Sequence, residues 1–570
     1  MPGGGFFLLE SQTPEKIFTP EDFTGEQRAI AKTTDEFWAQ EVAPNLDEIQ
    51  RQNFELTKRV LRKSAELGLT GVFVPEKYGG MEMDLASMMI VAQGMARDGS
   101  YATCHGAQVG IGALPVLLFG TEEQKQKYLP RLASAELIAA YALTEPHAGS
   151  DALAARTRAD LSPDGTHYVL NGQKMWITNG GFADLFTVFA KVGGEKFTAF
   201  LVERAFPGVS SGAEEKKMGL KGSSTTAVYF DKVKVPVENV LGEVGRGHII
   251  AFNILNIGRL KLGVFAHGGA LEALADSLRY SRERKAFGKP ICEFGLIQEK
   301  LASMAIRMYA NESMAYRVVG DIEAQLSDFS WAAAGAPERM LKAVEEYAAE
   351  CSFVKVFASE MLDFVVDEGV QIHGGYGYHQ DYLIERAYRD SRINRIFEGT
   401  NEINRLLATG MLLKRAMRGR LPLVDAVMQL QSEILSGGAA GEPISNAKKL
   451  GLLLIGVAFQ KYREKLEEQQ EVLAGITDVL MNTYAMESAS LRARKIHREN
   501  AADMAAAFSS GALDAIEISA RTVLARCCQG DELRTNLAVL RRFTKRETLD
   551  TIALRRRIAG RLLVAGKYTV

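Results

Sequence analysis

The sequence predicts a multidomain α+β protein that is mainly helical, and three observations indicate this class. The chain has 570 residues, more than one hydrophobic core holds, so we expect three or four domains. Hydrophobic residues make up 47% of the chain and charged residues 24%, which excludes an intrinsically disordered protein. Apolar residues follow a helical period along most of the chain, and strand-like runs interrupt it once. The predicted order is therefore helical, β, helical and again helical.

The first predicted domain is helical and covers residues 1–138. Apolar residues such as Ile30, Phe37 and Trp38 recur at the spacing of an amphipathic helix. The Pro- and Gly-containing stretch GVFVPEKYGG, residues 71–80, is typical of a loop between such helices.

The second predicted domain is β and covers residues 139–245. Runs such as FTVFAKV and FTAFLVE are rich in Val, Phe and Thr, and NG, PDG, GG and PG turn sequences separate them. Val233, Val235 and Val237 alternate with Lys234 and Pro236, as expected of a half-buried strand.

Two further helical domains are predicted, at 246–430 and 431–570, with a linker at SGGAAGEPISN, residues 436–446. One long apolar stripe indicates a helical bundle in the first of them. The stripe consists of Val344, Tyr347, Ala348, Cys351, Val354, Ala358, Met361, Leu362 and Val365.

Composition excludes several classes of function. The net charge of −2 gives no electrostatic case for nucleic-acid binding, so the expected partners are small molecules or proteins. The five cysteines lack zinc spacing and fit a reducing cytoplasm; Cys527 and Cys528 are most simply packed thiols. The eight histidines form no metal-ligand pattern, so no metal is predicted. The N-terminus MPGGGFFLLESQTPEK resembles neither a signal nor a transit peptide, and we expect a cytoplasmic protein that can also lie at the periphery of a membrane.

The motif RIFEGTNEINR, residues 395–405, offers a single carboxylate, Glu398, in a turn ahead of a helical pattern. Gly399 allows a substrate to approach the main chain, and Thr400 or Asn401 can cap the following helix. These features predict a catalytic base aimed outward from the turn. The alternative is an ordinary Glu at a helix start, favoured by the helix dipole.

Two segments in the β domain have the form of binding loops. In YALTEPHAGSD, residues 141–151, the hydroxyls of Thr144 and Ser150 can hold a ring system or a carbonyl-bearing ligand. In WITNGG, residues 176–181, Trp176 can stack on a planar cofactor and Thr178 can bond a ring nitrogen. Each segment could also be a plain strand end.

Together with RKAFGKPICEFGLIQEKLA (284–302) and QIHGGYGY (371–378), these segments resemble the acyl-CoA dehydrogenase flavoprotein family in order and spacing, over residues 25–415. The added C-terminal domain and FNILNIGR (252–259) look most like its very-long-chain branch. The resemblance implies an N-terminal helical domain, a middle β-barrel, a C-terminal four-helix bundle and an extra helical domain. It also implies FAD between barrel and bundle, completed by a neighbouring subunit, and a homodimer.

The resemblance assigns expected roles to motif positions. Expected to line the flavin ring are Tyr141, Leu143, Thr144, Trp176 and Thr178, with Thr400 and Glu402 following the base. Expected to meet the rest of FAD across the subunit interface are Arg284, Phe287, Gln371, Gly374 and Gly375. Expected to contact acyl-CoA are Ser150, Arg259 and Gly399.

The chemistry that the resemblance implies is α,β-dehydrogenation of an acyl-CoA thioester, in which Glu398 takes the pro-R α proton and a β hydride passes to flavin N5. Electron-transferring flavoprotein is the implied electron acceptor. An oxidase of the same fold and a non-catalytic assembly scaffold are the alternatives, and the retained Glu398, Trp176 and Thr144 argue against the scaffold. Two positions, Gly295 and Ala286, depart from shorter-chain relatives, and each departure is expected to weaken one flavin contact.

Two further expectations concern substrate and surface. Gly106, Gly110 and Ala113 fall on one helix face and predict a groove for an acyl tail, although small residues can also serve close helix packing. The segment KKLGLLLIGVAFQKY, residues 448–462, is too short to span a bilayer and predicts a buried helix rather than one resting on lipid. We expect the extra domain to pack on its own bundle and the active site to remain intact without it.

Overall fold

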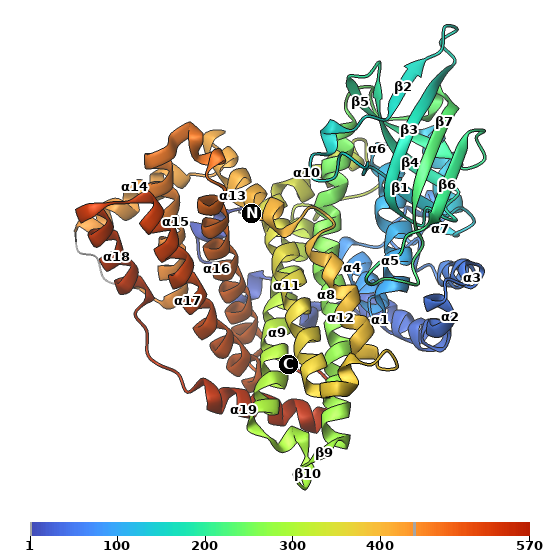
Figure 1. The fold of residues 1–570 in the computed structure, drawn as a ribbon. Helices are drawn as coiled ribbons and strands as arrows, with labels where there is room; N and C mark the ends of the chain where they lie inside the picture. The colour runs from blue at the N-terminus through green and yellow to red at the C-terminus, as the bar shows by residue number, and fades with distance from the viewer. Residues whose placement is uncertain (1–2, 437–440) are drawn as a thin grey trace.

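The computed structural model describes residues 3–436 and 441–570 and places the β domain at one end of a helical body (Figure 1). Residues 437–440 of the predicted linker lie outside the described residues. The linker is shorter than expected, because Pro443 already occupies the first turn of a helix, where its missing N–H costs nothing.

The N-terminal helices pack as a compact group against the bundle. Thr24 and Thr121 start two of them with capping boxes closed by Gln27 and Gln124. A π-helical turn, η7 (Gln108–Gly112), follows α5 and changes the register of its continuation. The helices are α1 (Gly25–Phe37), α2 (Leu46–Gln50), α3 (Phe54–Glu66), α4 (Leu85–Met95), α5 (Gly99–Ala107), α6 (Leu114–Phe119) and α7 (Glu122–Ala133).

The middle domain is an eight-stranded sheet in the order β6-β7-β3-β2-β4-β5-β8, and β1 pairs with β4. Phe200 of β5 and Phe230 of β7 share one core although three strands separate them, so the sheet curls around its own interior. The edge strands at the two ends of this order are β6 and β8. The strands are β1 (Ala139–Ala142), β2 (Arg158–Leu161), β3 (His167–Thr178), β4 (Leu185–Val192), β5 (Lys196–Glu203), β6 (Val209–Glu214), β7 (Thr225–Pro236) and β8 (Val240–Leu241).

Four long helices form the predicted bundle: α8 (Gly247–Glu283), α9 (Gly295–Ala324), α11 (Ala348–His373) and α13 (Asn401–Met417). The predicted stripe is interrupted at Tyr347, where α10 (Ala336–Glu346) ends and α11 begins. A small hairpin, β9 (Lys285–Ala286) and β10 (Lys289–Pro290), follows α8, and α12 (Leu383–Ser391) precedes the turn that carries Glu398. By length and composition α8 could cross a membrane, but 67% of its most apolar stretch is buried inside the protein.

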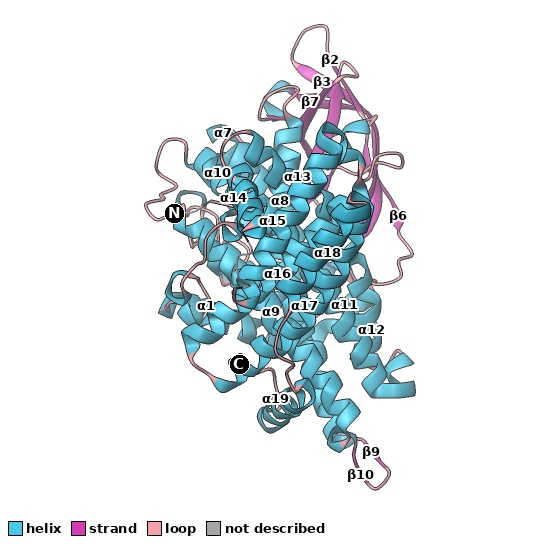
Figure 2. Ribbon diagram, turned by 90° about the vertical axis from the view of Figure 1, so that its left-hand side faces the viewer, coloured by secondary structure: helices cyan, strands magenta, loops and turns pink. Residues whose placement is uncertain are grey.

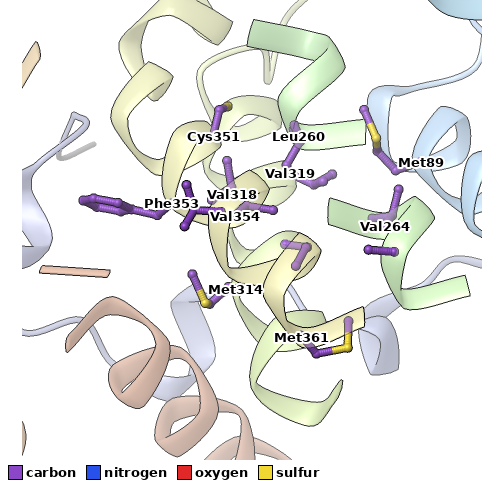
Figure 3. Packing of buried hydrophobic residues seen from close by; sticks show 14 of the residues in the cluster. Met89, Leu260, Val264, Met314, Val318, Val319, Cys351, Phe353, Val354 and Met361 are labelled. Carbon is purple, nitrogen blue, oxygen red and sulfur yellow. The ribbon is translucent and has the colours of Figure 1, made fainter. Parts of the chain in front are cut away.

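The bundle core interlocks side chains from α8, α9 and α11 (Figure 3). Leu260 and Val264 of α8 meet Val318 of α9 and Val354 of α11, and Met89 joins them from α4 (Figure 3). Each of these residues is at most 1% exposed, so the bundle has a tightly packed core.

The extra domain packs along α9 and α13, as predicted, and in Figure 2 its helices lie over those of the bundle. Most apolar residues of the predicted buried run in α15 are buried, including Leu450, Leu454 and Ile455, while Phe459 near its end is 48% exposed. The burial of the run supports a core helix over one that rests on lipid. The helices are α14 (Leu423–Leu435), α15 (Pro443–Tyr462), α16 (Gln470–Ile496), α17 (Glu499–Cys527), α18 (Gly530–Thr544) and α19 (Thr551–Ala565). Cys527 and Cys528 are both buried free thiols, as predicted.

Buried charges join the extra domain to the bundle. Arg317 of α9 donates to Glu487 of α16 at 2.9 Å, and Lys448 of α15 also pairs with Glu487. Arg492 of α16 donates to Glu312 of α9 at 2.7 Å. All five residues are at most 7% exposed, so each charge depends on its partner for solvation.

Residues 3–22, which we call the N-terminal segment, lie between the bundle and the extra domain. Gly5 N donates to Glu350 of α11 at 2.6 Å, and Lys448 donates to the carbonyl of Glu10 at 2.9 Å. The ring of Phe7 lies 6.1 Å from that of Phe353 and 5.0 Å from that of Tyr484. The N-terminal helical domain therefore starts at α1, and the N-terminal segment before it connects the bundle to the extra domain.

Candidate active site

The turn that carries Glu398 has an unusual backbone, because Glu398 and Gly399 both have left-handed φ values, of +59° and +81°. Such a φ is strained for Glu and needs support from its surroundings. Asn404 supplies it by donating Nδ2 to the carbonyls of Glu398, Gly399 and Thr400 at 3.3, 2.8 and 3.0 Å. Thr400 accepts from Ile403 N at 3.2 Å, so Thr400 is the cap of α13.

Two buried cations tie the same turn to the bundle. Arg259 of α8 donates Nε to the carbonyl of Glu398 at 3.2 Å. Lys355 of α11 donates Nζ to the carbonyl of Gly399 and to Asn401 Oδ1, both at 2.7 Å. Burial lowers the pKa of Lys355 to about 7. Sequence reasoning missed Lys355 and Asn404; a Lys within an apolar helical stripe was the available signal for the first.

The carboxylate of Glu398 points inward, and the expectation that it would be aimed outward was wrong. Its Oε2 atom is buried and has no hydrogen-bond partner. A Cβ on Gly258 of α8 would lie 2.5 Å from that oxygen, so the absence of a side chain there makes room for it. Burial raises the pKa of Glu398, and the charges of Arg259, Lys355 and Lys261 oppose that shift.

The carboxylate faces a cavity bounded by α5, α8, α11, α12 and the turn. Gly258 and Glu272 both line it and stand fourteen residues apart on α8, a span of about 21 Å at the rise of a helix. Apolar side chains form much of the wall, among them Ile254, Ile257, Leu262, Phe265, Leu362 and Val366. The cavity can therefore accept a long, narrow, apolar molecule at the carboxylate.

The predicted glycine face opens onto this cavity in part. Gly106 and Gly110 line it, as predicted. Ala113 does not line it and is 4% exposed, because the π-helical turn η7 shifts the register and turns Leu114 toward the cavity instead.

The β domain supplies the other side of the site. Tyr141 of β1 is buried, and both burial and the charge of Glu398 raise its pKa. Thr178, at the end of β3, lines the cavity with Glu398. Trp176 is 61% exposed and has a φ of +57°, at a register shift between β3 and β7. This bulge turns the indole out of the sheet, where a planar ligand can cover it.

The loop after β1 is pinned beneath the sheet. Lys174 of β3 donates to Glu145 at 2.7 Å and to the carbonyl of Leu143 at 3.2 Å. The carbonyl of Thr144 accepts from Met175 N at 2.9 Å, so its main chain is fixed while its side chain stays partly exposed. Ser150 is exposed further along the loop.

The remaining expected cofactor residues lie at the opposite end of the molecule, near β9 and β10 (Figure 1). Phe287 is 95% exposed, and Arg284 stacks its guanidinium 5.6 Å from the ring centre of Tyr376. Gln371, Gly374 and Gly375 are also exposed. One chain does not bring this cluster to Glu398. Glu402, on the first turn of α13, is exposed.

Among residues 3–436 and 441–570 no group of His, Cys, Asp and Glu could hold a metal ion. His373 has a structural position: Nδ1 bonds the carbonyl of Gly369 at 2.8 Å, Nε2 lies 3.3 Å from Asp276, and the ring stacks on Tyr280 at 4.1 Å. His147 is exposed.

Comparison with known proteins gives matches along most of the chain. Residues 24–136, 140–233 and 245–412 match the N-terminal, middle and C-terminal domains of acyl-CoA dehydrogenase, and residues 446–542 match a further acyl-CoA dehydrogenase C-terminal domain. A probable acyl-CoA dehydrogenase of Bacillus subtilis is 50% identical, over 100% of this chain and 98% of the relative. A very long-chain specific acyl-CoA dehydrogenase from rat mitochondria is 42% identical over 70% of this chain and 57% of its own length.

A solved structure resembles the whole chain. The crystal structure of an acyl-CoA dehydrogenase complexed with FAD from Bacillus anthracis has a TM-score of 0.98 and 49% identity, and each chain is covered completely.

Proposed function

The chain belongs to the acyl-CoA dehydrogenase family and is an FAD-dependent enzyme of that kind, and from this premise we propose its substrate, its base and its pathway. The proposed reaction is the oxidation of long-chain fatty acyl-CoA thioesters to trans-2-enoyl-CoA in fatty-acid β-oxidation, with Glu398 as the base. The observation that carries this proposal is the unpartnered, buried carboxylate at one side of a long apolar cavity.

Glu398 is suited to removing an α proton, since no hydrogen-bond donor occupies its Oε2 atom and lowers its basicity. Burial raises its pKa and so increases its affinity for the proton it receives. Because Asn404, Arg259 and Lys355 fix the carbonyls of its turn, the carboxylate is held before substrate arrives. The main-chain N–H of Glu398 would donate to the thioester carbonyl, where negative charge develops as the proton leaves.

The residues near the cavity fit a flavin. The exposed indole of Trp176 offers an apolar face, and Thr144 and Thr178 offer hydroxyl groups beside it. We propose that Leu143, Thr400 and Glu402 complete the contacts from the same chain, and that a second copy contributes the cluster at its opposite end. When bound, FAD supplies the acceptor for the hydride from the β carbon.

The separation of the two cofactor clusters supports a homodimer in which each chain completes the other's site. Arg284, Phe287, Gln371, Gly374 and Gly375 would then meet the flavin held at the partner's β domain. Sizing by light scattering checks the dimer, and a tetramer would contradict it.

For the substrate, we propose that Arg259, Ser150 and Gly399 contact the acyl-CoA. Electron-transferring flavoprotein is the proposed electron acceptor. An oxidase would instead return its electrons to oxygen. Stopped-flow reoxidation of the reduced enzyme in air separates the two, since fast reoxidation by oxygen would favour the oxidase.

The function is tested by anaerobic bleaching of the yellow enzyme with a series of acyl-CoA chain lengths. Each buried methylene contributes about 0.8 kcal/mol, so long chains should be preferred until the cavity is filled. Glu398→Gln should keep fold and FAD but lose bleaching by at least about 100- to 10,000-fold, the usual contribution of a general base. Equal efficiency on butyryl-CoA and palmitoyl-CoA would exclude the long-chain assignment, and bleaching of Glu398→Gln at the normal rate would exclude the base.

A further inference from the structure

Lys261 places an amino group in the wall of an otherwise largely apolar cavity. It stands three residues after Gly258 on α8, so the two share one face of the helix and both line the cavity. The residue is 6% exposed. Its Nζ atom donates to the carbonyl of Gly106 at 3.0 Å, and among the residues that the structure describes this is its one hydrogen bond. An ammonium has three donors, so the group is under-coordinated for a buried cation.

Small residues on α5 and η7 create the space that this ammonium occupies. Gly110 has no side chain, and a Cβ there would lie 3.0 Å from Lys261 Nζ. The ring of Phe265, one turn further along α8, lies with its centre 5.6 Å from the same nitrogen. The position is thus shaped by its neighbours, while the charge in it lacks a carboxylate within ion-pair distance in the described part of the chain. His105 of α5 also interacts with this charge, but burial and the charge of Lys261 lower the pKa of His105 to about 3, so its imidazole is neutral above about pH 5.

Four titratable or charged side chains act on the Glu398 carboxylate from the elements around it. Arg259 and Lys261 do so from α8, Lys355 from α11 and Tyr141 from β1. Arg259 and Lys355 donate hydrogen bonds to the carbonyls of the turn itself. Lys261 has no bond to the turn, so any effect it has on the carboxylate is exerted through space.

The charge of Lys261 affects the ionisation of Glu398 most strongly when the cavity contains no water. When an acyl chain displaces water, an isolated carboxylate favours its protonated form and can no longer accept the α proton. The attraction of a nearby cation grows as the surroundings become less polar. An ammonium that does not contact the carboxylate counteracts protonation without blocking the oxygen that must receive the proton.

We propose that Lys261 acts electrostatically on the base: the electric field of its ammonium keeps the Glu398 carboxylate ionised when substrate fills the cavity. Lys261 is therefore a positioning residue and does not itself touch the reacting atoms. This inference rests on the proposed role of Glu398 as the base. Burial lowers the pKa of Lys261 to about 7 while the charge of Glu398 opposes the shift, so the ammonium is present on the acid side of neutrality, where Glu398 most needs it.

The direction of the effect follows from the sign of the charge. Removing the cation raises the pKa of Glu398, so the acid limb of the pH profile for flavin reduction moves to higher pH. At a fixed pH on that limb, a tenfold weaker acid dissociation of Glu398 lowers the rate about tenfold. Above the limb the rate of the variant approaches that of the unmodified enzyme, because Glu398 is then ionised in both.

The test is stopped-flow reduction of the FAD-bound enzyme by octanoyl-CoA without oxygen, from about pH 5.5 to 9, so that the limb is covered. Lys261→Met keeps the length of the side chain and removes the charge, and Lys261→Arg keeps a charge. The control is Lys342→Met, which removes the charge of an exposed lysine of α10 that does not line the cavity. We expect a displaced acid limb for Lys261→Met, partial or full return for Lys261→Arg and no displacement for Lys342→Met. An unmoved limb in Lys261→Met would overturn the proposal.

A second readout does not depend on turnover. The infrared C=O band of protonated Glu398, assigned by its loss in Glu398→Gln, should titrate at higher pH in Lys261→Met than in the unmodified protein. An unchanged midpoint would also overturn the role of Lys261. Bleaching of Glu398→Gln at the normal rate, by contrast, would refute the proposed base itself, so the two failures are distinguishable.

Discussion

At the scale of the residue, the site depends on a missing side chain and a missing hydrogen-bond donor as much as on the groups present. Gly258 has no side chain, and the Glu398 carboxylate occupies the place where one would be. The same carboxylate has an oxygen without a donor. Both features lower stability in an ordinary helix or core, and their presence together at one point is typical of a functional site.

Gly258→Ala tests this arrangement. The added Cβ would approach Oε2 of Glu398 to 2.5 Å, so the carboxylate must move. A displacement of about 1 Å can cost about 100-fold in rate, while Ala is about 1 kcal/mol better than Gly within a helix. We expect flavin reduction to fall roughly 100-fold, with thermal stability unchanged or higher. Gly560→Ala on α19, whose Cβ would meet open space, is the control and should leave the rate unchanged. A normal rate in Gly258→Ala would show that the carboxylate position is not constrained.

Single residues also mark what the sequence could and could not predict. Glu398 and the cap at Thr400 follow from local rules, because a turn and a helix start depend on neighbours in the chain. The inward direction of Glu398 does not, since it depends on Gly258 and Lys355, which lie on other helices and meet the turn only through folding. Lys355 was hidden for the same reason: within a helical stripe its partner on another element cannot be read from spacing.

At the scale of the element, α5 and η7 decide how far the cavity extends. A helix without the π-helical turn would present Gly106, Gly110 and Ala113 on one face, which is what the spacing predicts. The extra residue in the turn moves Ala113 away and Leu114 in. A π turn leaves little trace in composition, so this detail required the structure.

Gly106→Leu should shorten the usable cavity. A Cβ at Gly106 would already lie 2.8 Å from the ring of Phe265, so a larger side chain closes the space between α5 and α8 there. Phe265 is seven residues beyond Gly258 on α8, about 10 Å away along the helix. We expect bleaching by butyryl-CoA to persist and bleaching by palmitoyl-CoA to fall at least tenfold. Steady-state efficiency across the chain-length series measures this, and equal losses on both substrates would contradict it.

The contact between α11 and the N-terminal segment predicts a dependence of stability on pH. Glu350 accepts from Gly5 N, its other oxygen is buried without a partner, and burial raises its pKa to about 7. The folded protein therefore holds this proton more tightly than the unfolded chain, whose pKa is near 4.5. Stability from this group is present below the unfolded value and is lost as pH rises toward 7, by up to about 3 kcal/mol.

Glu350→Gln removes that titration while keeping an acceptor for Gly5. We expect the variant to be more stable than the unmodified protein at pH 8, with the difference shrinking toward pH 5, as measured by urea unfolding at each pH. Glu345→Gln, on the exposed side of α10, is the control and should track the unmodified protein. A stability difference that does not change with pH would count against the buried, protonated Glu350.

At the scale of the whole molecule, the extra domain is joined to the bundle by charges that cannot face apolar surroundings alone. The expectation that the active site stays intact without this domain remains a prediction. Truncation after residue 430 would remove Glu487 from Arg317 and Arg492 from Glu312, and would uncover the apolar face of α9. Domain order and class followed from the periodicity of the sequence, but this interdependence did not, since the partners lie at least 170 residues apart.

Glu487→Gln measures the strength of this connection. It leaves Arg317 and Lys448 buried with one carboxylate fewer, and breaking a buried pair typically costs about 3 to 5 kcal/mol. Glu467→Gln is the control, because its pairing with Lys414 is exposed and such pairs contribute about 0 to 1 kcal/mol. Urea unfolding compares the two, and equal effects would show that the buried network does not stabilise the domain contact.

The N-terminal segment finally has a consequence for how the protein is made. Glu10 and Lys448 are 438 residues apart, and Ile17 and Lys495 are 478 apart. At about 5 to 20 residues per second, a ribosome needs roughly 20 to 100 seconds to deliver the second partner after the first. During that interval α11 emerges first and brings Phe353 to Phe7, whereas Tyr484 and Lys495 of α16 reach Phe7 and Ile17 only later. The nascent chain thus carries a partly uncovered apolar segment until α16 emerges, and transiently exposed apolar surface of this kind is what chaperones bind during translation.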